Sequence, residues 1–75
     1  MNYVMEKFQN GSKEIEVWGT NKSWLNAAMQ RKNAAAAGRA TYIVRDADMG
    51  ETLPTDKFLG NVVIRSIPTT GKTAN

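Results

Sequence analysis

The 75-residue chain contains neither cysteine nor histidine. Without cysteine it can form no disulfide, no thiolate nucleophile and no cysteine-ligated metal site. Without histidine it lacks the side chain whose unperturbed pKa lies nearest physiological pH, so general acid–base chemistry would fall to seven carboxylates. These absences predict a protein that is not an enzyme and that carries no cofactor.

Long hydrophobic runs are also missing. No stretch approaches the ~20 apolar residues of a membrane span, and residues 1–9 lack the apolar core of a signal peptide. Together with the lack of cysteine, this predicts a cytoplasmic protein with no membrane partner. The chain has the length and the 41% hydrophobic content of one small domain. We place that domain at residues 1–68 and a flexible polar tail at 69–75.

One acidic segment has the spacing of a metal-binding loop. Asp46, Asp48 and Gly50 resemble the start of a calcium-binding EF-hand loop. Position six of such a loop must be glycine and position twelve a bidentate glutamate, but the chain has Glu51 and Lys57 there. The segment is therefore interpreted as a solvated turn, and no metal site is predicted.

Two short strands are predicted at residues 3–8 and 13–18, joined through Asn10-Gly11. Asn-Gly is the strongest short signal for a β-hairpin, because both turn positions require positive φ. A two-residue loop fixes the register, and opposite residues then share a face of the sheet. The predicted pairs are Val4–Val17, Glu6–Ile15 and Phe8–Lys13 on one face, and Tyr3–Trp18, Met5–Glu16 and Lys7–Glu14 on the other. The first face carries more aliphatic side chains and is expected to form the core.

A helix is predicted over residues 24 to about 37, with Ser23 as N-cap and Gly38 as left-handed C-cap. Its apolar side would comprise Trp24, Leu25, Ala28, Ala35 and Ala36, with Met29 at the margin. Lys32 falls within this apolar arc. Either its ammonium group extends past the sheet edge to reach water, or the helix is irregular near its end.

Two more strands are predicted at residues 40–45 and 62–67, the second ending at Pro68. The expected fold class is therefore α+β, with element order ββαββ. Four mainly antiparallel strands would form one sheet, and the single helix would pack on one face of it. Such a sheet has two free edges, which also allow a homodimer.

The charge distribution favours a binding function. No acid occurs between Val17 and Arg45, whereas this stretch and its end hold Lys22, Arg31, Lys32, Arg39 and Arg45. The first hypothesis is a non-catalytic module that binds a protein partner, as a regulator or inhibitor of a nucleic-acid-processing or transcription machine in a bacterial or phage-like context. Such machines expose acidic surfaces. The predicted partner-binding residues are Tyr3 and Trp18 as apolar anchors, with Lys22, Arg31 and Arg39 as a charged rim.

The alternative hypothesis is direct nucleic-acid binding, through the basic helix (residues 22–39) or an aromatic sheet face. Asn and Gln can bond adenine in the major groove, while Arg and Lys hold phosphates. The residues predicted for this role are Asn26, Gln30, Arg31, Asn33 and Arg39. Exposed Tyr3 and Trp18 would suit either hypothesis. The opposing interpretation is that the loop around Phe58 folds back and covers both aromatic rings.

Overall fold

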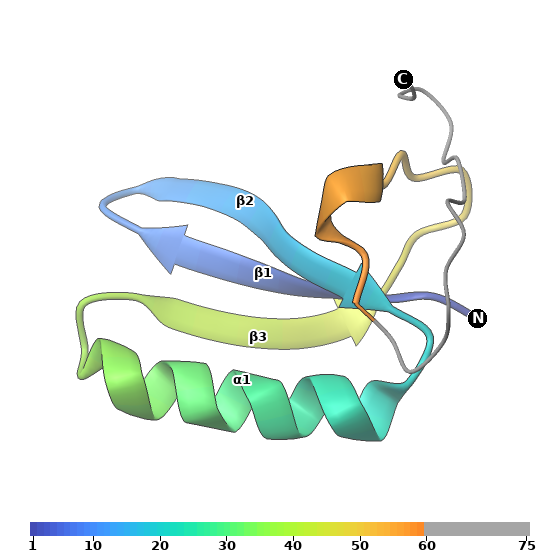
Figure 1. Cartoon of the computed structure of the whole chain (residues 1–75). Helices are drawn as coiled ribbons and strands as arrows, with labels where there is room; N and C mark the ends of the chain where they lie inside the picture. Colours follow the sequence, from blue (N-terminus) through green and yellow to red (C-terminus); the bar gives the residue numbers. More distant parts are fainter. Residues whose placement is uncertain (60–75) are drawn as a thin grey trace.

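The computed structural model describes residues 1–59 (Figure 1). Three strands form one sheet in the order β2-β1-β3, in which both neighbouring pairs are antiparallel. The elements are β1 (Tyr3–Gln9), β2 (Ser12–Gly19), α1 (Lys22–Ala36), β3 (Thr41–Asp46) and a 3₁₀ turn, η1 (Thr55–Lys57). The fold is a small α+β domain, as predicted. The predicted fourth strand at residues 62–67 and the tail at 69–75 lie outside the described residues.

The β1–β2 hairpin turns where the sequence predicts it. Asn10 and Gly11 both have positive φ, at 52° and 81°. The Ser12 hydroxyl donates to the Gln9 carbonyl oxygen at 3.0 Å and closes the turn. From this end the strands pair in the predicted register as far as Glu6, which lies opposite Ile15.

A β-bulge then shifts the register by one residue. Met5 pairs with Val17, so Glu16 has no Cα partner on β1. An extra residue in one strand changes which residue lies opposite each position of the other strand beyond the bulge. The bulge therefore overturns three of the predicted pairs: Val4–Val17, Tyr3–Trp18 and Met5–Glu16.

The corrected register separates the two aromatic residues that the sequence analysis placed together. Val4 now lies opposite Trp18, and Tyr3 lies opposite Gly19. Because neighbouring strand residues point to opposite faces, Tyr3 and Trp18 belong to different faces of the sheet. They cannot form one exposed patch.

The helix covers one face of the sheet (Figure 1). Met5 of β1 is fully buried there against Leu25 and Ala28 of α1. Partly buried side chains complete this cluster: Tyr3, Val17, Met29, Tyr42 and Val44. The face of Val4, which we expected to form the core, lies on the other side of the sheet and has a different cover.

That second cover is the loop between β3 and η1. Val4, Trp18 and Leu53 form a separate buried cluster. The indole Nε1–H of Trp18 donates to the Pro54 carbonyl oxygen at 2.6 Å. Its ring lies 4.3 Å from that of Phe58, centroid to centroid, and only 3% of the residue is exposed. The interpretation that the loop around Phe58 covers both aromatic rings is confirmed for Trp18 and wrong for Tyr3, which packs on the helix face.

Both helix ends differ from the prediction by about one residue or two. Asn21, not Ser23, is the N-cap, and its Oδ1 accepts from the backbone N–H of Trp24 at 3.0 Å. The left-handed C-cap is Ala37, with φ of 51°, and Gly38 follows it with φ of 86°. Two consecutive residues with positive φ therefore end the helix.

Candidate functional site

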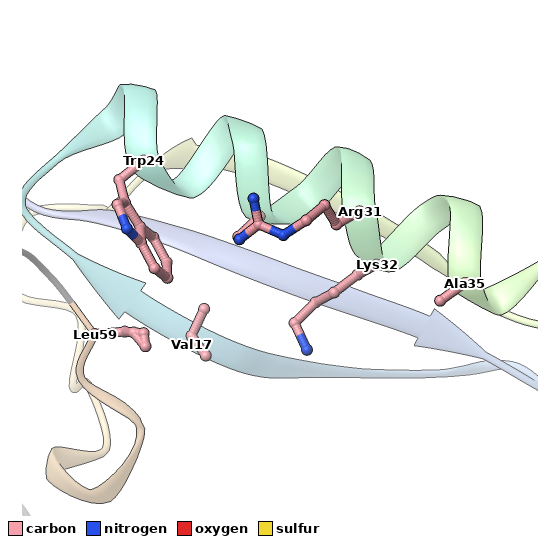
Figure 2. A pocket seen from close by; sticks show the side chains of 7 residues that line it. Val17, Trp24, Arg31, Lys32, Ala35 and Leu59 are labelled. Atoms are coloured by element: carbon pink, nitrogen blue, oxygen red, sulfur yellow. The ribbon is translucent and has the colours of Figure 1, made fainter.

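A groove of about 430 Å³ lies between α1 and β2 (Figure 2). Five of its lining residues come from one side of the helix, one from β2 and one from the segment after η1. They are Trp24, Ala28, Arg31, Lys32 and Ala35, with Val17 and Leu59. The groove exists because α1 packs mainly against β3, and much less against β2.

Asn33 fixes the helix on the β3 side. Its amide Nδ2 donates to the Tyr42 carbonyl oxygen at 3.0 Å, and the Tyr42 N–H donates to its Oδ1 at 2.8 Å. The side chain thus pairs with the strand as another strand would, at the edge of β3 that faces away from β1. Both ends of the amide are engaged, so a base contact by Asn33 would require breaking both bonds.

Trp24 supplies most of the apolar surface of the groove. It lies in the first turn of α1 and remains 38% exposed. Figure 2 shows its indole ring directed across the groove toward Val17 and Leu59. Adjacent helix residues point about 100° apart, so when Leu25 enters the core its neighbour Trp24 must face sideways. Trp24 was predicted on the apolar side of the helix, and its exposed position in the groove was not expected.

Lys32 crosses the groove to the edge strand. Its Nζ lies 3.4 Å from Oε2 of Glu16, the bulge residue, and 5.6 Å from the centre of the Tyr42 ring. The lysine side chain keeps 38% of its surface exposed. The prediction that Lys32 extends toward the sheet edge is confirmed. The alternative of an irregular helix is wrong, because α1 continues to Ala36.

Arg31 is the remaining cation of the groove. Its guanidinium lies between Trp24 and Lys32 (Figure 2). It is exposed, and within residues 1–59 it makes no hydrogen bond or ion pair. A guanidinium presents five donors in a planar fork that matches a carboxylate or a phosphate. Arg31 is therefore available to an anionic ligand that enters the groove.

The other residues predicted for binding are dispersed. Lys22 lies over the half-buried Tyr3 ring, with Nζ 5.7 Å from the ring centre. Arg39 donates to the Ala35 carbonyl oxygen at 3.4 Å, beyond the end of the helix. Of the other two amides predicted to bind nucleic acid, Gln30 is exposed and Asn26 is half-buried. Trp18, predicted as an apolar anchor, is buried and cannot contact a partner without opening its loop.

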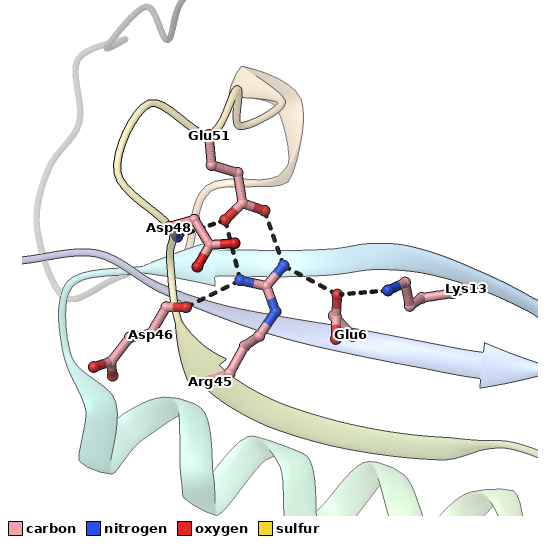
Figure 3. Close-up of polar contacts among 6 residues, drawn as sticks. All are labelled: Glu6, Lys13, Arg45, Asp46, Asp48 and Glu51. Carbon is pink, nitrogen blue, oxygen red and sulfur yellow. Dashed lines mark hydrogen bonds and ion pairs between the residues drawn. The ribbon is translucent and has the colours of Figure 1, made fainter.

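The carboxylates of the second face form a closed ion cluster (Figure 3). Arg45 Nη2 lies 3.0 Å from Glu6 Oε2 and 2.9 Å from Glu51 Oε2, and Nη1 lies 3.0 Å from Glu51 Oε1. Lys13 approaches Glu6 at 3.9 Å. The hydrogen bonds from Arg45 hold the pKa of Glu51 below its usual value, and those carboxylates raise the pKa of Arg45. The cluster ties the β3–η1 loop to the sheet.

Comparisons with protein-family models, with curated proteins and with solved structures gave no match. In the described part of the chain, no helix is long and apolar enough to cross a membrane. Residues 1–59 also hold no group of acids that could bind a metal ion.

Proposed function

We propose that this protein is a small, non-catalytic module that binds an acidic surface of a protein partner in the groove between α1 and β2. The observation that carries the proposal is Arg31, a cation without a counter-ion in residues 1–59, beside the exposed ring of Trp24. Tryptophan and arginine are the residue types that most often dominate binding energy at protein interfaces. A regulator or inhibitor of a nucleic-acid-processing machine would meet such acidic surfaces.

The apolar half of the groove supports a protein partner. Trp24, Val17 and Leu59 surround one end, where an aliphatic or aromatic side chain would be removed from water. The cations Arg31 and Lys32 lie beside it along the helix. Burying apolar area gives about 25 cal/mol per Å², and a charge-assisted contact at the rim adds specificity.

Charge argues against two other occupants. The helix α1 contains no acid, so an α1-to-α1 contact between two copies would bring Arg31 near like charge or no charge. Residues 60–75 carry Arg65 and Lys72 and no Asp or Glu. Neither a second α1 nor that segment of the chain offers a carboxylate side chain to Arg31. With these two occupants disfavoured, the proposed complement is an acidic segment of another protein.

Nucleic acid is the alternative anionic partner. The basic stretch and the exposed Gln30 and Arg39 would suit phosphate contacts. Two observations favour protein: the groove is lined mainly by apolar residues, and the amide of Asn33 is already bonded to Tyr42. Phosphate binding would weaken steeply with salt and would depend on Arg39 as much as on Arg31.

We also propose that residues 62–67 form the fourth strand, at the outer edge of β2. Asn33 occupies the outer edge of β3 at Tyr42, which leaves β2 as the better edge for pairing. The Leu59 N–H donates to the Trp18 carbonyl oxygen at 2.6 Å, so the chain reaches that edge just before residue 60. Slow hydrogen exchange at residues 63–66 is expected. Exchange as fast as in a free peptide would contradict this strand.

The functional proposal is tested by affinity capture from nuclease-treated lysate, followed by titration of the purified partner. Trp24→Ala and Arg31→Glu should each abolish capture while leaving the circular dichroism spectrum unchanged. Arg39→Glu is the matched control, because it makes the same charge change outside the groove. Equal loss in Arg31→Glu and Arg39→Glu, with binding restored by nucleic acid, would establish the alternative. Unchanged capture by Trp24→Ala and Arg31→Glu would refute the groove.

A further inference from the structure

The helix wall of the groove has the spacing of a helix-packing seam. Trp24, Ala28, Arg31 and Ala35 follow one another at intervals of four, three and four residues. This is the alternation of a and d positions, which in a coiled coil face a second helix. At 1.5 Å per residue the seam is roughly 16 Å long, or about three turns.

The size of the seam side chains also suits a helix. The exposed Ala35 lets a neighbouring backbone come close, within the roughly 8–10 Å separation of packed helices, and the buried Ala28 adds no bulk at the base of the groove. Trp24 stands at the N-terminal end of the seam as a large apolar contact, and Val17 of β2 forms the floor below it. Because α1 is displaced toward β3, the sheet surface beside it over β2 is where a second helix would pack on the same face.

We infer that the groove receives an amphipathic helix of the partner, about three turns long, lying along α1. Its apolar residues contact Trp24 and Val17, and one Asp or Glu on the same face pairs with Arg31. This inference rests on the proposed function and specifies the kind of segment that binds. The position of Arg31 within the seam makes the acid part of the packing face, so the charge selects the register of the bound helix.

An extended segment fits the same residues less well. A strand directs every second side chain to one face, at a spacing of about 7 Å. The α1 seam repeats every 3.5 residues on average, which is a spacing of about 5 Å along the helix. The bulge residue Glu16 and its partner Lys32 also interrupt the side of the groove along β2. The strand proposed for residues 62–67 would also occupy the outer edge of β2, so an extended partner segment could not pair there.

The test selects ligands without assuming their structure. A display library of fully randomised 16-residue segments is panned against the whole protein, with counter-selection on Arg31→Glu. Enriched sequences should show apolar residues at i, i+3 or i+4, and i+7, with an acid on that face. Synthetic peptides of these sequences should gain helical circular dichroism on binding. Their affinity should fall at least about tenfold for Arg31→Glu.

A charge exchange provides the strongest readout. Replacing the peptide's acid by lysine should abolish binding to the wild type and restore binding to Arg31→Glu, since the pair is then re-formed with opposite signs. Trp24→Ala should weaken both combinations, because the apolar contact does not depend on the charge pair.

The contrary results distinguish failure of the bound-helix inference from failure of the proposed binding groove. Arg31-dependent peptides with alternating apolar residues and no helical signal would overturn the helix and leave the binding groove intact. The absence of any Arg31-dependent peptide would overturn both. A free protein in which both the Trp24 ring and the Ala35 methyl group show nuclear Overhauser contacts to residues 60–75, unchanged by peptide, would identify the chain itself as the occupant and would also overturn both.

Discussion

Asn33→Ala should destabilise the fold by removing the attachment of α1 to the edge of β3. The substitution deletes two hydrogen bonds, of 3.0 and 2.8 Å, and leaves the Tyr42 N–H and carbonyl group without these partners. A net contribution of about 0.5–1.5 kcal/mol per hydrogen bond gives a loss of about 1–3 kcal/mol. Alanine has the higher helix propensity and returns up to about 0.7 kcal/mol. The free energy of unfolding should therefore fall by about 0.3–3 kcal/mol.

Asn26→Ala is the matched control for this experiment. It makes the same chemical change in the same helix at a residue that, within residues 1–59, has no hydrogen-bonded side chain. It should leave stability unchanged or raise it by up to about 0.7 kcal/mol. Urea unfolding of both variants measures the difference, and hydrogen exchange at the Tyr42 amide should accelerate only in Asn33→Ala. Equal stability of the two variants would refute the attachment. A loss confined to oligonucleotide binding would instead support the role that the sequence suggested for Asn33.

Three further predictions follow from the ion cluster, the second core and the helix end. Because the folded pKa of Glu51 lies below its usual value of 4.5, its carboxylate stabilises the fold above that value, and this contribution is lost as pH falls through the folded pKa. Glu51→Gln should thus flatten the dependence of the urea midpoint between pH 6 and pH 3, and an unchanged slope would contradict this account. Trp18→Phe removes the donor to the Pro54 carbonyl oxygen and should lower the free energy of unfolding by about 1–3 kcal/mol; a thermal midpoint equal to wild type would show that this bond contributes nothing. Ala37→Gly relieves a left-handed alanine and should stabilise by about 0.5–1 kcal/mol, measured by calorimetry, whereas a lower midpoint would show that chain entropy outweighs the strain.

The parts of the fold that local chemistry determines could be predicted from the sequence. Asn10-Gly11 requires positive φ, and that requirement alone fixes the turn and the pairing next to it. The register beyond the bulge could not be derived in this way, because an inserted residue preserves every pair between the bulge and the turn. The only signal was the adjacent apolar pair Val17-Trp18. In a strand with one buried face, apolar residues occur at every second position, whereas these two are neighbours and lie on opposite faces.

The candidate site was harder to predict because it depends on how far the helix is displaced. Arg31 and the basic helix could be identified from the sequence, but Tyr3 and Trp18 were grouped with them through a register that the bulge changes. Helical periodicity gives the direction of Trp24 only to within the width of the apolar arc. Its exposure follows from the pairing of Asn33 with β3, a contact between residues that no local pattern connects.

The central position of β1 determines the order in which this domain can fold. Its pairing with β2 joins neighbours in sequence, but its pairing with β3 brings Val4 opposite Arg45. A two-stranded hairpin is at best marginally stable in water, so the hairpin gains lasting stability only when β3 closes this long loop. The same event brings Arg45 to Glu6 and the start of the β3–η1 loop to Trp18. We therefore expect closure of β3 on β1 to be the slow, cooperative step, and both hydrophobic clusters to become protected from solvent only after it.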